Sequence, residues 1–371
     1  MTTWFTPADC RLADFRAVVE QTTSLDDYPH AVAVEQNVLI YDNPGPSARD
    51  ELTSALLDGP GIVVFKNAFD PAVVDRAGAA FSAMIEEQRA AGVAGGDHFA
   101  KPGANDRIWG ALDKFAVRDP DGFAAYYASD ALALISRAWL GDGYQVTSQI
   151  NVVNPGGQAQ VAHRDYHLGF MEREQALSYP AHTHRLSPAL TLQGAVAHVD
   201  MPVETGPTLY LPHSQKYAPG YLAFHDPAFT AYFNQNYVQL PLAKGDAAFF
   251  NPALFHGAGT NRTSDIRRMA NLLQVSSAFG RAMESVDRVA MCKALYPTLL
   301  SFEGNVDNVI AASAEGYAFP TNLDRDQPVD GLAPQTQASL VRQALSEKWD
   351  ESRFASALES HTARRLPEVT R

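Results

Sequence analysis

The sequence has few cysteines, no long apolar run and a deficit of positive charge. Cys10 and Cys292 are the only cysteines in 371 residues, so a disulfide framework is excluded and a reducing compartment is favoured. The N-terminus has no apolar signal-like core, and no stretch reaches the length of a membrane span. The net charge of −13 opposes binding to a polyphosphate backbone. We therefore expect a cytoplasmic protein that binds neither nucleic acid nor membrane.

The remaining composition is that of a globular protein, with 46% hydrophobic and 10% aromatic residues. Residues 1–143 combine helical periodicity with a few strand-like runs, and residues 280–371 show helical periodicity, whereas residues 144–279 show short apolar runs separated by Gly, Pro and Asn. This pattern predicts a mainly β protein with flanking helices, whose core is a double-stranded β-helix (a cupin-like jelly roll). We expect residues 1–371 to form a single domain with helical additions at both ends.

Several local signals predict individual elements. Asp70 followed by Pro71 predicts the N-cap and first position of a helix that reaches about Ala91. The segment 108–115 is predicted to be a short strand, and the segment 119–140 a single helix that ends at a glycine.

A pair of polar side chains gives the first indication of chemistry. His163 and Asp165 lie two residues apart, so on an extended strand both point the same way. An imidazole and a carboxylate that project together hold two adjacent corners of a metal's coordination sphere. With a second histidine they form the two-histidine, one-carboxylate face that suits Fe(II). Spacing alone does not select this pair, because His198 and Asp200 repeat it.

A candidate for the third ligand follows a second strand-like run. The run 245–250 ends at Asn251 and Pro252, and His256 lies at the start of the next run; Asn261 and the pair Arg267 and Arg268 lie beyond it. A guanidinium on a strand beside a metal-binding histidine can hold the remote carboxylate of a dicarboxylate while the other end chelates the metal.

Residues 59–280 resemble the phytanoyl-CoA dioxygenase family of Fe(II)- and 2-oxoglutarate-dependent oxygenases. The resemblance is carried by GIVVFKNAFDPAVVDR, PGGQAQVAHRD, ETGPTLYLPHSQK and GDAAFFNPALFHGAGTNRTSDIRR. It implies that His163, Asp165 and His256 hold the iron. It also implies that Arg267, eleven residues after the distal histidine, binds 2-oxoglutarate.

The sequence departs from the family pattern beside the distal histidine. The family often has a serine or threonine two residues after it, whereas this chain has Ala258. Thr208, Thr260 and Asn261 are the candidates to replace that hydroxyl. By strand alternation, Arg268 should point away from Arg267 and form a surface charge.

Two further groups of polar residues have more than one interpretation. Gln149 and Asn151 share one face of a strand, where they serve either as hydrogen-bonded core residues or as cosubstrate contacts. The segment 166–189 mixes apolar and cationic side chains, as expected of a lid over the iron. The substrate contacts predicted within it are Tyr166, His167, Arg173 and Arg185.

The resemblance implies a dioxygenase that uses Fe(II), 2-oxoglutarate and O2 and releases succinate and CO2. Because no dense Lys/Arg cluster lies near the motifs, we expect a small, partly apolar free molecule as the substrate rather than a CoA thioester. Hydroxylation is the expected outcome, with desaturation, epimerisation and cyclisation as alternatives. An interpretation from another class is a non-catalytic jelly roll that holds a structural metal. The C-terminal helices are expected to pack on the barrel or to form a homodimer.

Overall fold

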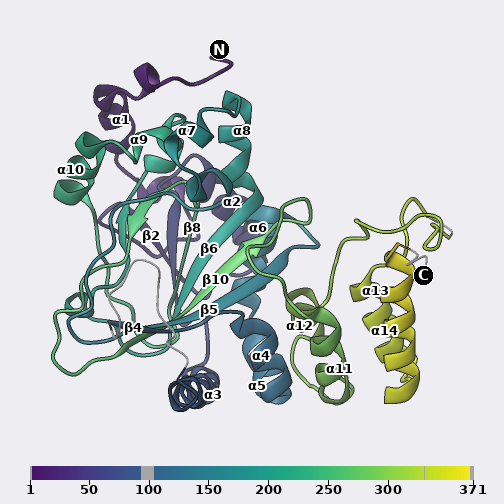
Figure 1. Cartoon of the computed structure of the whole chain (residues 1–371). Helices are drawn as coiled ribbons and strands as arrows, with labels where there is room; N and C mark the ends of the chain where they lie inside the picture. Colours follow the sequence, from purple (N-terminus) through teal and green to yellow (C-terminus); the bar gives the residue numbers. More distant parts are fainter. Residues whose placement is uncertain (1, 93–103, 330, 368–371) are drawn as a thin grey trace.

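A computed structural model describes residues 2–92, 104–329 and 331–367. A mixed eight-stranded sheet runs through its centre, and all neighbouring strands are antiparallel except β2 and β3 (Figure 1). In spatial order the strands are β1 (Ala33–Glu35), β2 (Val38–Asp42), β3 (Ile62–Lys66), β8 (Ala247–Phe250), β6 (Thr191–Ala197), β10 (Arg268–Ser276), β5 (Gln145–Val153) and β4 (Asn105–Ile108).

A second, smaller sheet faces the first. It consists of β7 (Leu209–Leu211) and β9 (Phe255–Gly257), which pair antiparallel. An isolated bridge joins one further chain segment to each of these strands. His163 pairs with His256 of β9, and Val238 pairs with Tyr210 of β7. The two sheets enclose a cavity, and the predicted jelly-roll core is confirmed.

Period-two alternation divides the side chains of the large sheet between its two faces. On β10, Met269 and Leu273 belong to the main apolar core, whereas Arg268 and Gln274 line the cavity. The same division holds on β3, where Val63 packs into the main core. Because successive residues of a strand point to opposite faces, strands such as β3 and β10 contribute both to the apolar core and to the cavity wall.

Helices cover the outer face of the large sheet (Figure 1). They are α2 (Arg49–Leu57), α3 (Pro71–Ala90), α4 (Ala111–Arg118), α5 (Pro120–Tyr127), α6 (Asp130–Leu140), α11 (Arg288–Leu299) and α12 (Val306–Ser313). The cap of α3 is confirmed, since Asp70 accepts a hydrogen bond from the Ala72 backbone N–H at 2.8 Å. The C-terminal helices α13 (Gln337–Ser346) and α14 (Glu351–Arg365) pack on α11.

A third group of helices lies at the end of the barrel near the N-terminus (Figure 1). They are α1 (Leu12–Val19), α7 (Arg173–Ala176), α8 (Ala181–Leu186), α9 (Gly220–Ala223) and α10 (Pro227–Asn236). None of the helices within the described ranges is long and apolar enough to cross a bilayer.

Two of the predicted elements were wrong. The segment 108–115 is not a strand, because β4 ends at Ile108 and α4 begins three residues later. The expected helix over 119–140 is two helices, because the Ser129 hydroxyl accepts the Leu132 N–H at 3.3 Å and so caps a new helix.

Candidate metal and cosubstrate site

Strand pairing places the two histidines side by side. His163 and His256 face each other across an antiparallel bridge and exchange both backbone hydrogen bonds, at 2.9 and 3.1 Å. Directly opposite residues of an antiparallel pair project from the same face. The imidazole centroids are accordingly 4.5 Å apart.

The same backbone fixes how the imidazoles are oriented. The Nδ1 atom of His163 lies 2.8 Å from the Val161 carbonyl oxygen, and that of His256 lies 2.9 Å from the Leu254 carbonyl oxygen. A carbonyl can only accept, so each Nδ1 carries the proton and each Nε2 presents a lone pair to the site. This arrangement is typical of metal-binding histidines.

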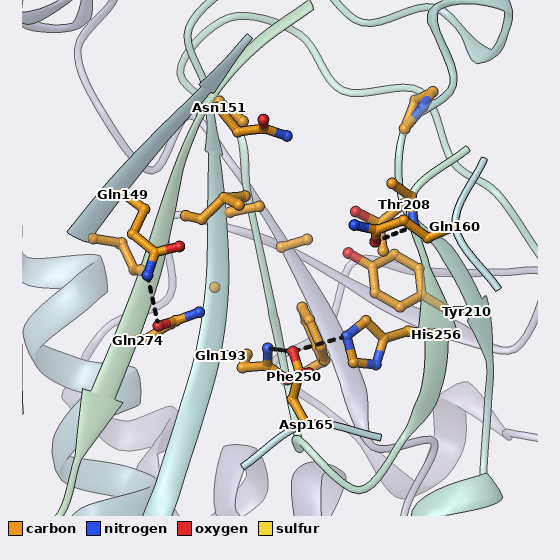
Figure 2. A pocket seen from close by; sticks show the side chains of 18 of the residues that line it. Gln149, Asn151, Gln160, Asp165, Gln193, Thr208, Tyr210, Phe250, His256 and Gln274 are labelled. Carbon is orange, nitrogen blue, oxygen red and sulfur yellow. Dashed lines mark hydrogen bonds and ion pairs between the residues drawn. The ribbon is translucent and has the colours of Figure 1, made fainter. Parts of the chain in front are cut away.

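Asp165 completes the cluster. Its carboxylate oxygens lie 3.7 Å from His163 Nε2 and 3.4 Å from His256 Nε2. The Gln193 side-chain amide on β6 donates to the same carboxylate at 2.5 Å, as Figure 2 shows. Burial opposes ionisation, but the neighbouring imidazoles, which stabilise the carboxylate when they are protonated, and this hydrogen bond outweigh it and hold the pKa of Asp165 well below its ordinary value. Asp165 is therefore a carboxylate in this site.

The residue between the two ligands fixes the backbone from the opposite side. Arg164 is fully buried, and its guanidinium donates to the carbonyl oxygens of Ser214, at 2.6 Å, and Tyr217, at 2.9 Å. Tyr221 lies under the same guanidinium, 5.1 Å away, and its hydroxyl donates to the Asp165 carbonyl oxygen. The segment that carries His163 and Asp165 is not part of a regular strand, so these side-chain contacts hold its backbone in place.

The donor set suits Fe(II). The three ligand atoms, two imidazole nitrogens and one carboxylate oxygen, lie within 4.8 Å of one another. Such a facial set leaves the other coordination positions open, which a four-ligand structural zinc site does not. The site opens into a cavity of about 340 Å³ between the two sheets.

The two neighbouring arginines are placed opposite to expectation. Arg268 turns into the cavity and is only 6% exposed, so its predicted surface position was wrong. Arg267 instead points outward, where it donates to Asp106 at 3.1 Å and to Asn154 at 3.2 Å. A one-residue difference from the family spacing is enough to exchange the faces of two adjacent strand residues.

The other predicted cosubstrate contacts are divided between the cavity and its surroundings. Gln149, Asn151 and Thr208 line the cavity, as does Ala258. Asn261 does not, because its side-chain amide donates to the carbonyl oxygens of Val153 and Ile266 and its oxygen accepts from Thr263. Thr260 is also directed elsewhere, since its hydroxyl accepts the Ala159 N–H.

Most of the segment 166–189 is helical and does not line the cavity. Of its residues, only Phe170 is among the lining residues. Tyr166 is buried with its hydroxyl against the Met283 sulfur, and His167 contacts Ser187. The expected substrate contacts Arg173, in α7, and Arg185, in α8, lie outside the cavity wall.

The alternative pair is not brought to this site. His198 is buried just beyond β6, where its Nε2 lies 3.0 Å from the Tyr126 hydroxyl. Asp200 accepts the Lys244 backbone N–H on another surface.

The cavity residues that were not foreseen from the sequence include Tyr210, Gln193, Arg107 and Trp109. Tyr210 is the cross-strand partner of His256, and Gln193 holds Asp165. Arg107 and Trp109 enter from β4 and the residue that follows it. Tyr210 lies two residues after Thr208, a predicted site residue, so strand alternation could have placed the tyrosine on the same face. For the other three, the sequence offers no motif.

Comparison with known proteins agrees with this geometry. Residues 57–269 match the model of the phytanoyl-CoA dioxygenase (PhyH) family, which is more than half of the chain. The dioxygenase trt7 of Aspergillus terreus is 26% identical over 232 residues, covering 60% of this chain and 72% of that protein. The dioxygenase cdmD of Talaromyces verruculosus is 32% identical over 132 residues, covering 34% of this chain and 38% of that protein.

Among solved structures, the non-heme alpha ketoglutarate dependent epimerase SnoN from nogalamycin biosynthesis is similar to this chain. The match covers 63% of this chain and 82% of that protein, with 20% identity and a TM-score of 0.44.

A mixed jelly roll with a two-histidine, one-carboxylate centre defines a non-haem iron protein of the oxygenase class. The chain belongs to the phytanoyl-CoA dioxygenase family.

The expectation of a 2-oxoglutarate-dependent dioxygenase that uses iron, 2-oxoglutarate and O2 is therefore confirmed, and the non-catalytic alternative is set aside.

Proposed function

We propose that this enzyme hydroxylates a small, partly apolar organic molecule. His163, Asp165 and His256 hold the iron, and Arg268 replaces Arg267 as the residue that binds the remote carboxylate of 2-oxoglutarate. The apolar part of the cavity wall supports a partly apolar substrate; it includes Val64, Met201, Leu240, Leu242, Phe250 and Leu272.

The assignment of the cosubstrate site depends on one observation, which is that the Arg268 guanidinium is buried and incompletely hydrogen-bonded. Its Nη1 has no hydrogen-bond partner among the residues that the structure describes, and burial lowers the pKa of its guanidinium to about 10. A buried cation that lacks an anion is costly, and a bound carboxylate would remove that cost. The half-buried Thr208 and the Tyr210 hydroxyl line the same region, so they are the hydroxyl donors that would stand in for the family residue replaced by Ala258.

Iron, when bound with 2-oxoglutarate and O2, supplies an oxidant that removes hydrogen from an unactivated carbon, with release of succinate and CO2. The chain's part is to position the reactants and to exclude water. The Nδ1 hydrogen bonds of His163 and His256 hold both rings with Nε2 toward the site, and Gln193 holds the Asp165 carboxylate. None of these groups needs to transfer a proton.

The test begins without the substrate. The purified protein, supplied anaerobically with Fe(II) and 2-oxoglutarate, should develop the visible charge-transfer absorption of the chelated iron. Admission of O2 should then release succinate slowly, and a metabolite screen in the presence of ¹⁸O2 should yield a product that contains one labelled oxygen. A product that lacks the label would replace hydroxylation by desaturation, epimerisation or cyclisation. Absence of both the absorption and succinate would overturn the proposal.

The predictions of domain organisation, cellular location and oligomeric state are proposals. We propose one catalytic unit over residues 1–371, in a cytoplasmic protein that forms a homodimer through residues 280–371. The free thiols of Cys10 and Cys292 support the reducing location. Analytical ultracentrifugation of the full chain and of a variant with charge reversals on the outer face of α14 tests the dimer.

A further inference from the structure

A row of polar side chains crosses the inner face of the large sheet. It starts at Gln193 on β6, continues through Gln274 on β10 and Gln149 on β5, and ends at Arg107 on β4. All four side chains line the cavity and are at most 8% exposed. Since β6, β10, β5 and β4 are consecutive neighbours, the row follows a diagonal across four strands.

Hydrogen bonds connect three of the four side chains, and strand pairing places the fourth beside them. Arg107 Nη1 donates to the Gln149 side-chain oxygen at 3.3 Å, and the Gln149 amide donates to the Gln274 oxygen at 3.5 Å. Gln274 is the direct cross-strand partner of Gln193, whose amide reaches Asp165. Figure 2 shows Gln149 and Gln274 on one wall and Gln193 beside the metal ligands. A polar track therefore leads from a guanidinium to the iron site.

The iron end of the row has an unused acceptor. The Gln193 amide nitrogen is turned to the Asp165 carboxylate, because a carboxylate can only accept from it. Its Oε1 atom is consequently turned away, is buried, and has no hydrogen-bond partner among the described residues. A buried amide oxygen without a hydrogen bond is destabilising, so a ligand O–H or N–H that donates to this atom would be favoured.

The far end of the row is cationic and flat. The Arg107 guanidinium lies over the Trp109 ring, 4.6 Å from its centroid, and both residues line the cavity. Glu284 interacts with Gln149 but is not among the lining residues, and its Oε1 accepts the Gly110 N–H at 2.8 Å. The described part of the cavity wall at this end therefore includes a guanidinium stacked on an aromatic ring.

We propose that this row is the substrate-binding subsite and that the substrate is a ring-sized molecule with an anionic oxygen at one end and a hydroxyl at the other. Arg107 binds the anionic oxygen, and Gln193 accepts from the hydroxyl next to the carbon that reacts. The row spans three strand spacings, ~14 Å between backbones, so the molecule is larger than a simple acid. This inference rests on the proposed function, because the iron centre defines which end of the substrate reacts.

The probe is a hydroxynaphthoate whose hydroxyl and carboxylate lie at opposite ends of the ring system. Its methyl ester and the naphthoate without the hydroxyl are the matched ligands. Binding to the full-length protein, loaded anaerobically with Fe(II) and 2-oxoglutarate, is measured by calorimetry. The charge-transfer absorption of the same sample reports separately whether the iron and the cosubstrate are in place.

Two substitutions test the two ends of the row separately. Arg107→Gln should weaken binding of the hydroxy acid on the order of tenfold or more and leave the ester unchanged. Arg107→Lys keeps the charge and serves if the glutamine variant does not fold. Gln193→Leu should remove the preference for the hydroxy acid over the unsubstituted naphthoate. The control is Arg267→Gln, which removes a surface arginine near the same strands and should change neither value.

The outcomes separate the two proposals. If the absorption does not form in the wild-type protein, the iron and 2-oxoglutarate assignment fails. If it forms but the acid, the ester and the unsubstituted naphthoate bind equally, or none of them binds, the subsite is refuted. Equal weakening by the Arg107 and Arg267 substitutions would likewise refute it, because only one of these arginines lines the cavity.

Discussion

Replacing Arg268 with methionine is the sharpest test of the cosubstrate site. The substitution keeps an unbranched stem of similar length in the cavity and removes the guanidinium. A charge-assisted pair in a buried site loses about 2–5 kcal/mol on truncation. At 1.4 kcal/mol for each factor of ten, the affinity for 2-oxoglutarate should fall by roughly 30-fold to several thousand-fold.

The same substitution should have the opposite effect on the protein without cosubstrate. Arg268 is 6% exposed and has a nitrogen without a partner among the described residues, so its charge destabilises the empty site. Arg268→Met should therefore leave the melting temperature unchanged or raise it, and it should remove the extra stability that 2-oxoglutarate gives the wild type. Thermal unfolding with and without 2-oxoglutarate measures both effects.

The matched control is the adjacent arginine. The side chain of Arg267 is 47% exposed and forms a surface ion pair with Asp106, so Arg267→Met should cost at most about 1 kcal/mol of stability. Its affinity for 2-oxoglutarate, from titration of the charge-transfer absorption, should stay within a few-fold of the wild-type value. Normal affinity in the Arg268 variant together with a large loss in the Arg267 variant would show that the face assignment along β10 is incorrect.

The remaining predictions concern the histidines. His163→Ala, Asp165→Ala and His256→Ala should each lose bound iron and turnover, whereas His198→Ala should keep the iron; metal analysis decides, and full retention in any of the first three variants would contradict the assignment. Burial lowers the pKa of His198 to about 3, against about 6.5 in an unfolded chain, so its contribution to stability is complete above pH 6.5 and decreases as the pH falls towards 3. Denaturant unfolding between pH 6.5 and 5 should show a slope that His198→Asn reduces by up to about 1.4 kcal/mol per pH unit; an unchanged slope would mean that the histidine is protonated in the folded state.

The features that were predicted correctly are those that depend on local sequence pattern. Alternation and turn residues were sufficient for the jelly roll, and the spacing of His163 and Asp165 selected two residues that the structure brings together with His256. Family order separated that pair from His198 and its aspartate. In each case the information lay within a short segment or in the order of segments along the chain.

What the sequence did not predict depends on which strands are neighbours. Arg268 could not be separated from Arg267 by counting from the distal histidine, because one residue of register exchanges their faces. Gln193 and Arg107 carry no motif, and only the order of strands β6, β10, β5 and β4 brings them to one wall. The cationic residues of the segment 166–189 looked suitable for a substrate, but local helices direct them elsewhere.

The irregular segment that carries two of the three ligands has a consequence for motion. His163 is joined to the small sheet by an isolated bridge rather than a full strand, whereas Asp165 is held from the large sheet by Gln193. Bound metal would therefore connect the two sheets through a segment that has few backbone hydrogen bonds of its own. Amide hydrogen exchange over residues 158–170 should slow on metal binding far more than exchange within β10, where the ladder is continuous on both sides. The metal would then act as a cross-link that orders the segment holding two of its own ligands.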